Sequence, residues 1–250
     1  MIERVTRQAV VSGGGTGIGR AIAARLAADG ADVVIVGRRP EVLAAAAEEI
    51  NGGVGAPRVT TATADLTSPD EVQRLAATLP DTVDVVVNNA GGNFGNAGNG
   101  DLADVAAAWE ADVRGNVLPA VLLTEALLAR LTRPGGRIVT ITSIAALRGP
   151  GSYGGAKAAL HPWSLGLAQT LAPEGITVNV VAPGFVPDTE FWADRLTDDV
   201  MASRLGQIPM GRPGTPAEVA AAVAHFAAPD AGWTTGQILQ VNGGTLQGRG

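Results

Sequence analysis

Short runs of consecutive apolar, β-branched residues alternate with longer Ala- and Leu-rich stretches along the whole chain. Continuous apolar runs are typical of strands buried on both faces, and the longer stretches have the apolar periodicity of helices. The predicted strands span residues 9–12, 32–36, 58–64, 83–88, 136–143, 176–183 and 236–244. The predicted helices span residues 17–29, 40–50, 67–79, 102–131, 152–171 and 215–228, and residues 188–210 are expected to be irregular or short-helical.

This alternation predicts an α/β fold, a Rossmann-type doubly wound parallel sheet of about seven strands with helices on both faces. No linker or low-complexity stretch divides the chain, so we expect one domain over residues 1–250. Local signals agree with the helix starts. Pro40 opens a helix, and Ser68 is a predicted N-cap with Glu71 completing a capping box.

Composition excludes several kinds of protein. The net charge is −6 and no basic run is present, which argues against nucleic acid as a partner. The chain has no cysteine, and His161 and His225, expected on helix surfaces, have no spacing that suggests a metal site. The longest apolar stretch, residues 117–131, is too short to span a bilayer, and the N-terminus lacks an apolar signal core. We therefore expect a cytoplasmic protein without a bound metal.

The stretch "VVSGGGTGIGRAIAARLAADG" is a strand, a glycine turn and a helix. Gly13, Gly17 and Gly19 would let the backbone turn sharply and approach a pyrophosphate, and the helix N-terminus would offer free N–H groups. Glycine spacing alone is a weak signal, but the flanking strand and helix strengthen it. This turn predicts a dinucleotide site.

The end of the second strand reads "IVGRRP", where NAD-binding proteins usually have a carboxylate for the ribose hydroxyls. Arg38 can instead pair with a 2′-phosphate in a forked geometry, and Arg39 is a second guanidinium beside it. The alternative is that both are solvated loop arginines. We favour the phosphate interpretation, and hence NADP(H) over NAD(H).

The only tyrosine and the only lysine of the chain, Tyr153 and Lys157, are one helical turn apart. An ammonium group close to a phenol lowers the phenol pKa, and a tuned phenol can exchange a proton with a carbonyl or alcohol oxygen. Such a pair is more often two ordinary helix-surface residues. Here it follows a strand that ends in "TITS", at the end of the sheet where ligands bind.

With these motifs the chain resembles a short-chain dehydrogenase/reductase nearly from end to end, particularly the 3-oxoacyl-ACP reductase-like members. "SGGGTGIG" resembles the family's cofactor turn, with Ser12 in place of the usual threonine. The other matching segments are "ADLT", "NNAG", "WEADVRGNV", "ITS", "YGGAK" and "NVVAPGF".

The resemblance implies roles residue by residue. Tyr153 would donate the proton in reduction, Lys157 would lower its pKa and bind the nicotinamide ribose, and Ser143 would steady the substrate carbonyl. Asn116 would order a helix irregularity and a water. The implied cofactor residues are Gly13, Thr16, Gly17, Ile18, Gly19, Arg38, Arg39, Asp65, Leu66, Asn89, Ala90, Gly91, Tyr153, Lys157, Pro183, Gly184, Val186 and Thr189.

The chain also departs from the family pattern. The interval between Ser143 and Tyr153 is short, so Thr140 or Thr142 could take the serine role. Thr189 is one position later than usual, and Pro162 should bend the helix just past Lys157. The Gly- and Asn-rich residues 91–100 are expected to form a mobile rim of the pocket.

The expected function is NADPH-dependent reduction of a ketone (EC 1.1.1.-), such as a 3-oxoacyl thioester or a polyketide-like carbonyl. The alternatives are an NAD-dependent alcohol or sugar dehydrogenase, and a cofactor-sensing protein without turnover. Residues 185–210 are expected to form a lid whose apolar side chains suit a small-molecule substrate of moderate bulk. The resemblance also implies a homotetramer, or less often a dimer, assembled through residues 102–131 and 152–171 and through the last strand and tail.

Overall fold

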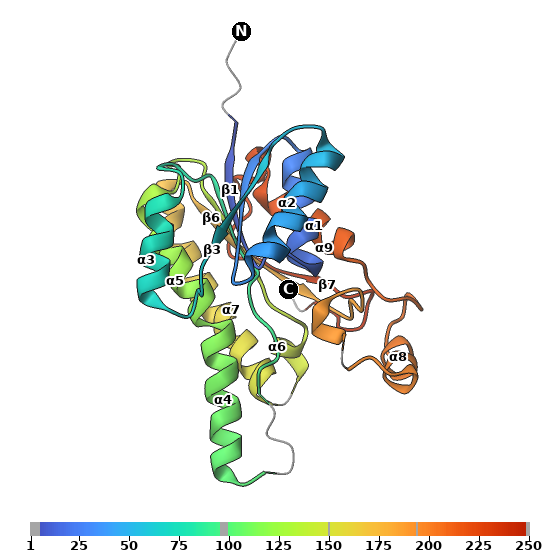
Figure 1. Cartoon of the computed structure of the whole chain (residues 1–250). Coiled ribbons are helices and arrows are strands. Elements are labelled where there is room, and N and C mark those ends of the chain that lie inside the picture. The colour runs from blue at the N-terminus through green and yellow to red at the C-terminus, as the bar shows by residue number, and fades with distance from the viewer. Residues whose placement is uncertain (1–5, 96–99, 150, 194, 249–250) are drawn as a thin grey trace.

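The computed structural model describes residues 6–95, 100–149, 151–193 and 195–248 (Figure 1). Its strands are β1 (Gln8–Ser12), β2 (Asp32–Gly37), β3 (Val59–Thr63), β4 (Val85–Asn88), β5 (Arg137–Ile141), β6 (Thr177–Pro183) and β7 (Ile238–Val241). They pair in parallel in a 7-stranded sheet of order β3-β2-β1-β4-β5-β6-β7. The predicted Rossmann-type doubly wound sheet is confirmed.

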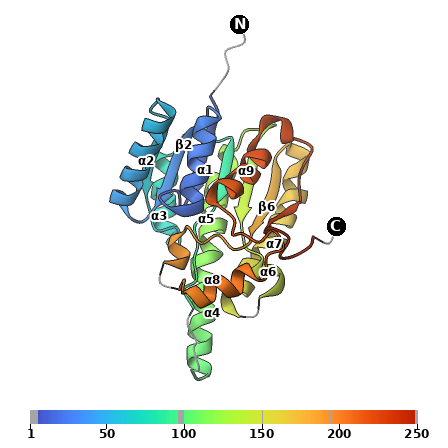
Figure 2. The ribbon, with the colours of Figure 1, turned by 90° about the vertical axis from the view of Figure 1, so that its right-hand side faces the viewer.

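Helices cover both faces of the sheet. The helices α1 (Gly17–Ala28), α2 (Pro40–Val54) and α9 (Pro216–Ala227) lie on one face, which Figure 2 shows toward the viewer. The opposite face is covered by α3 (Pro69–Thr78), α5 (Leu118–Leu127) and α7 (Ser152–Leu171). In β1, Ala9 and Val11 face the first layer and Val10 faces the second, because successive strand side chains point to opposite sides. Two separate apolar cores therefore fix the sheet from both sides.

The helix predicted over residues 102–131 is wrong as one element. It is divided into α4 (Leu102–Asn116), α5 and a 3₁₀ turn (Leu128–Arg130), with Val117 between the two helices. Pro119 follows the break and has no N–H group to continue the hydrogen bonds of α4, but it fits the first turn of α5. The break leaves Asn116 buried at the end of α4.

The segment 185–210 contains a 3₁₀ turn (Glu190–Trp192) and α8 (Asp198–Leu205), as expected of an irregular, short-helical region. The short α6 (Ala145–Arg148) was not predicted. Pro162 does not interrupt α7, which continues past it as one helix, and the bend expected there stays a prediction. Among the described residues, no helix combines the length and the apolar character needed to cross a membrane.

The cap predicted at α3 is half right. The Ser68 side chain accepts a hydrogen bond from the Glu71 N–H, but the Glu71 carboxylate accepts from the Asp65 N–H at 2.8 Å instead of closing the box. A complete capping box occurs at α9, between Thr215 and Glu218. Glu71 thus ties the end of β3 to α3, close to where a ligand would reach this edge of the sheet.

Candidate active site

A cavity of about 1360 Å³ lies at the carboxyl ends of the strands, where the strand order reverses between β1 and β4. Every residue that the resemblance implies for cofactor binding lines it, as do Ser143, Tyr153 and Lys157. Asn116 lies behind the wall, fully buried. The volume exceeds that of a usual small-ligand pocket, so it has room for a dinucleotide and a substrate together.

The glycine turn between β1 and α1 is held in shape by the chain that follows β4. Gly13 and Gly17 have φ of +65° and +50°, and a Cβ atom at Gly19 would lie 2.0 Å from the Gly13 carbonyl oxygen. The Asn89 amide donates to the carbonyls of Ser12 and Gly13 at 3.0 and 3.2 Å. Thr16, the N-cap of α1, makes no side-chain bond to the helix, so the first N–H groups of α1 remain available to an anion. The turn fits a pyrophosphate.

The far end of the cavity carries the two arginines after β2. Arg38 is exposed and lines the cavity. Arg39 forms an ion pair with Glu190 at 2.6 Å, and the same carboxylate accepts a hydrogen bond from Thr16. Glu190 therefore connects the segment 185–210 to the glycine turn, a contact that no motif in the sequence indicated. The Asp65 carboxylate accepts from the Thr67 N–H at 2.9 Å, and this hydrogen bond lowers its pKa.

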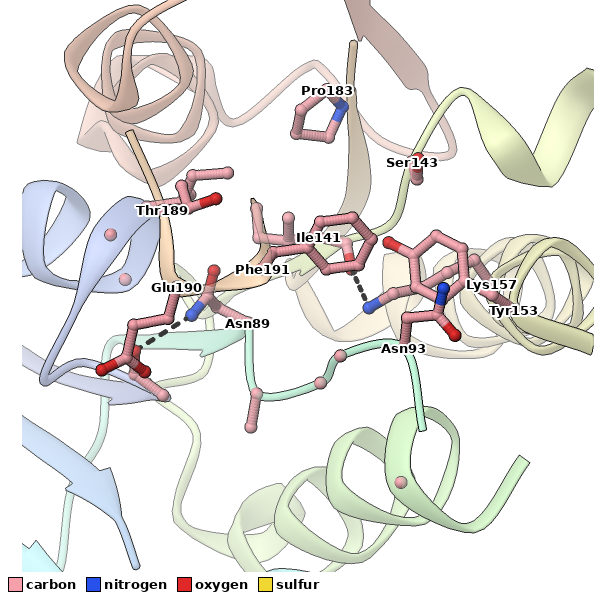
Figure 3. Close-up of a pocket in the computed structure, with 18 of the residues that line it drawn as sticks. Asn89, Asn93, Ile141, Ser143, Tyr153, Lys157, Pro183, Thr189, Glu190 and Phe191 are labelled. Carbon is pink, nitrogen blue, oxygen red and sulfur yellow. Dashed lines mark hydrogen bonds between the residues drawn. The ribbon is translucent and has the colours of Figure 1, made fainter. Parts of the chain in front are cut away.

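Tyr153 and Lys157 both point from α7 into the cavity (Figure 3). The Lys157 ammonium is buried and donates to the Ile141 carbonyl at 3.3 Å. A Cβ atom at Gly91 would lie 2.6 Å from Asn116 Oδ1 and 2.9 Å from Lys157 Nζ, so only glycine lets these groups approach. Asn116 in turn donates to the Gly92 carbonyl at 2.8 Å and accepts from its N–H at 3.1 Å. The amide thus holds the chain after β4 against the lysine.

Burial shifts both pKa values toward the neutral forms. It raises the pKa of Tyr153 to about 12, which the neighbouring Ser143 hydroxyl partly opposes. It lowers the pKa of Lys157 to about 8, which the charge of Asp112 partly opposes. Desolvation is the largest effect on Tyr153, so its pKa is raised where the sequence predicted that the lysine would lower it. At neutral pH this phenol is protonated and able to donate.

Asp112 is a buried carboxylate that the sequence analysis missed. It has no exposed surface, and it accepts hydrogen bonds from the Phe94 N–H at 2.8 Å and the Ser152 hydroxyl at 2.7 Å. It lies one helical turn before Asn116, and its charge acts on both Tyr153 and Lys157. No signal in the sequence distinguishes it, because the same helix carries the exposed acidic residues Asp104 and Glu110.

Ser143 is better placed for a carbonyl than the two threonines weighed against it. The Thr140 hydroxyl is fully buried without a partner among the described residues. The Thr142 hydroxyl is buried and bonded to His161 Nε2 at 3.0 Å. The expectation of a surface position for His161 is wrong, since it is 8% exposed and lies against the strand end. His225 is exposed, as predicted.

The rim of the cavity is formed by the chain after β4 and by the 3₁₀ turn at Glu190–Trp192. The backbone N–H groups of Phe94 and Gly92 donate to Asp112 and Asn116 of α4, and the mobility expected of this rim stays a prediction. Residues 96–99 of that rim lie outside the described part of the chain. Across the opening, the Phe191 ring lies 5.4 Å from the ring of Tyr153 and 5.2 Å from that of Trp192.

The residues expected beside a nicotinamide also lie together. Pro183 ends β6, Gly184 donates to the Val241 carbonyl, and Val186 is buried. A Cβ atom at Gly17 would lie 3.1 Å from the Thr189 methyl group, so this threonine packs on the glycine turn despite its later position. Among the described residues, no group of three or more His, Cys, Asp or Glu could hold a metal ion.

Comparisons with known proteins agree with this geometry. A family model described as "Enoyl-(Acyl carrier protein) reductase" matches residues 13–245. Nodulation protein G of Rhizobium sp. (strain N33) is 38% identical, covering 98% of both chains. The 3-oxoacyl-[acyl-carrier-protein] reductase FabG of Escherichia coli (strain K12) is 37% identical over 94% of this chain and 96% of its own. A crystal structure of a variant of actinorhodin polyketide ketoreductase with NADPH has a TM-score of 0.84 at 30% identity, covering 98% of this chain and 99% of that one.

The fold, the nucleotide-sized cavity and these similarities define an oxidoreductase of the NAD(P)-dependent kind. The chain belongs to the short-chain dehydrogenase/reductase family.

Proposed function

We propose that the protein is an NADPH-dependent reductase of ketones, forming secondary alcohols. The observation that carries this proposal is the placement of Tyr153 and Lys157 side by side on α7, both directed into the cavity at the strand ends. The relatives named 3-oxoacyl reductase and polyketide ketoreductase support a carbonyl as the reacting group. A 3-oxoacyl thioester or a polyketide-like ketone is the substrate class we expect.

The proton for the carbonyl oxygen comes from the Tyr153 hydroxyl, and the hydride for the carbonyl carbon comes from the nicotinamide of the bound cofactor. A phenol whose pKa is raised to about 12 is protonated at neutral pH, which favours reduction over alcohol oxidation. The Lys157 ammonium stabilises the phenolate left behind, and Ser143 donates a hydrogen bond to the oxygen as negative charge develops. Asn116 and Asp112 hold the surrounding chain in place.

The cofactor preference rests on the arginines after β2. Arg38 and Arg39 would bind the 2′-phosphate, the turn at Gly13–Gly19 the pyrophosphate, and Asp65 with Leu66 the adenine. Pro183, Gly184, Val186 and Thr189 would border the nicotinamide. No carboxylate ends β2, so the usual partner of an unphosphorylated ribose is missing there. Residues 185–210 would act as the lid of this single domain.

The experiment is a substrate screen with purified protein, following the absorbance of the reduced cofactor. NADPH oxidation with 3-oxoacyl thioesters or aromatic ketones, with far less activity on the matching 2-enoyl thioester, is the expected result. Faster turnover of alcohols with NAD⁺ would favour the dehydrogenase alternative. Cofactor binding with no turnover of any carbonyl or alcohol would favour a cofactor-sensing protein.

We also propose that the chain forms a homotetramer or dimer, with α4 in one interface. Leu102, Val105, Trp109 and Val113 follow each other at helical spacing and are exposed on α4. This helix projects from the body of the molecule (Figure 1). Light scattering after gel filtration tests the assembly, and Val105→Glu with Val113→Glu should reduce its mass. A monomeric wild type would contradict it.

A further inference from the structure

Three arginines line the substrate end of the cavity: Arg148 at the end of α6, Arg195 after the 3₁₀ turn, and Arg204 in α8. They stand out in a chain of net charge −6. Among the described residues, the carboxylates that line the cavity are those of Asp65 and Glu190, and both lie toward the glycine turn and the arginines after β2. Within the described ranges, none of the three guanidiniums forms a salt bridge with a carboxylate.

Neutral groups hold these guanidiniums in place. Arg195 donates to the Asn93 carbonyl at 2.9 Å and lies 5.4 Å over the Phe191 ring. Arg204 lies 5.7 Å over the Trp192 ring. Stacking on an aromatic ring uses the flat face of a guanidinium and leaves edge N–H groups for a ligand.

Arg148 is positioned in the same way, by a hydrogen bond of 3.1 Å to the Gln207 side-chain oxygen. Since an amide oxygen carries no full charge, the positive charge at this end of the cavity is not neutralised by its partners. Arginine clusters that present edge N–H groups are suited to phosphate and carboxylate.

Arg148, Arg195 and Arg204 form the arginine cluster, and Arg195 is the member that lies near the reacting groups. Phe191 contacts the ring of Tyr153 on one side and the Arg195 guanidinium on another. The charge of Arg195 acts on the phenol and lowers its pKa against the larger effect of burial. An anion bound at Arg195 would thus be about one aromatic ring away from a carbonyl at Tyr153, with apolar surface between them.

We propose that the physiological substrate carries an anionic group, a phosphate or a carboxylate, which the arginine cluster binds while the carbonyl lies at Tyr153. This inference rests on the proposed ketone reduction and specifies its substrate. The sequence predicted an apolar substrate, whereas this proposal implies an amphipathic one. The apolar body of that substrate lies against Phe191 and Trp192, and the anionic end reaches the rim.

Two matched substrate pairs test the proposal and separate the sources of the anion. Acetoacetyl-coenzyme A against the acetoacetyl thioester of N-acetylcysteamine tests a phosphate-bearing thioester. A medium-chain oxo acid against its methyl ester tests a carboxylate. We expect kcat/KM to be roughly 10-fold or more higher for the charged member of at least one pair, as charge-assisted hydrogen bonds imply. Added salt should reduce that preference.

The variants are Arg195→Gln and Arg204→Gln, which remove charge but keep a polar side chain. Each should lower kcat/KM for the charged member about 10-fold more than for the neutral member, mainly through KM. Arg74→Gln, on the exposed side of α3, is the control and should change neither. Equal losses for both members of a pair would mean that the arginines only support the lid, and would overturn the proposal.

The outcome for neutral ketones distinguishes this inference from the proposed function. If neutral ketones are reduced as well as charged ones, ketone reduction stands and the anionic substrate is wrong. If no ketone of either kind is reduced, ketone reduction itself is contradicted.

Discussion

The inner and outer ends of the cavity are built in different ways. At the inner end, Asp112, Asn116 and Lys157 are at most 4% exposed, and each is tied by hydrogen bonds to a neighbouring backbone or side chain. At the outer end, Arg195 and Arg204 are exposed and rest on aromatic rings. A buried polar network has one low-energy arrangement, whereas exposed side chains can change without unfolding the chain. The inner end is therefore suited to fixed chemistry and the outer end to substrate selection.

The largest effect should come from the inner end. Tyr153→Phe removes the proton donor and keeps the ring, so ketone reduction should fall roughly 10²- to 10⁴-fold. Affinity for NADPH, followed by fluorescence titration, should remain within a few-fold of wild type. A variant that turns over at the wild-type rate would show that another group donates the proton.

Arg38→Ala tests the cofactor end of the comparison. Loss of a charge-assisted contact to phosphate should raise the KM for NADPH about 10- to 100-fold, and leave the KM for NADH nearly unchanged. The control is Arg25→Ala, which removes an exposed ion pair on α1 away from the cavity. Equal use of both cofactors by the wild-type protein would contradict our NADP assignment.

Asp112→Asn sharpens the comparison through pH. Burial lowers the pKa of Lys157 to about 8, and the negative charge of Asp112 partly opposes that lowering. Removing the Asp112 charge must therefore lower the pKa of Lys157 further. The ammonium is present below its pKa, so the pH above which reduction declines should move from about 8 to a lower value. At pH 8 the rate should fall several-fold, roughly the effect of one pKa unit.

Asparagine can still accept the Phe94 N–H bond, so the fold should survive this change. Glu110→Gln, an exposed position on the same helix, is the control and should leave the pH profile in place. An unchanged profile in Asp112→Asn would show that this carboxylate has only a structural role.

The smallest effect is expected at Glu190, which forms a solvent-exposed ion pair with Arg39. Exposed ion pairs contribute about 1 kcal/mol or less. Glu190→Gln should free Arg39 and lower the KM for NADPH by a few-fold at most, with a smaller change for NADH. Steady-state kinetics with both cofactors measure this, and a raised KM for NADPH would show that the ion pair supports the site.

The fold was predictable because the central strands β1, β2 and β4 contain continuous apolar runs, and both faces of the sheet are buried by helices. Tyr153, Lys157 and Ser143 could be predicted to lie at one cavity because their motifs are close in sequence and lie on one strand end and one helix. The break before Pro119 was missed, although a proline inside a helical pattern is a signal for it.

Other contacts could not be found in this way because their partners are far apart along the chain. Asp112 bonds residues 18 and 40 positions away, and Arg39 pairs with a residue 151 positions away. His161 was wrongly predicted to lie on the surface. Its burial depends on a contact with Thr142, 19 positions away, which the local sequence pattern does not show. The raised pKa of Tyr153 follows from the enclosure of the site, which no local pattern reports.

The hydrogen bonds from Asn89 to the glycine turn have a consequence for nucleotide capture. They fix the carbonyls of Ser12 and Gly13 within the protein itself. An arriving dinucleotide meets a loop that is already shaped, and little backbone freedom is lost on association. Little of the binding free energy between the pyrophosphate and this loop is therefore needed to order the loop. The association rate is set by diffusion and charge rather than by loop folding.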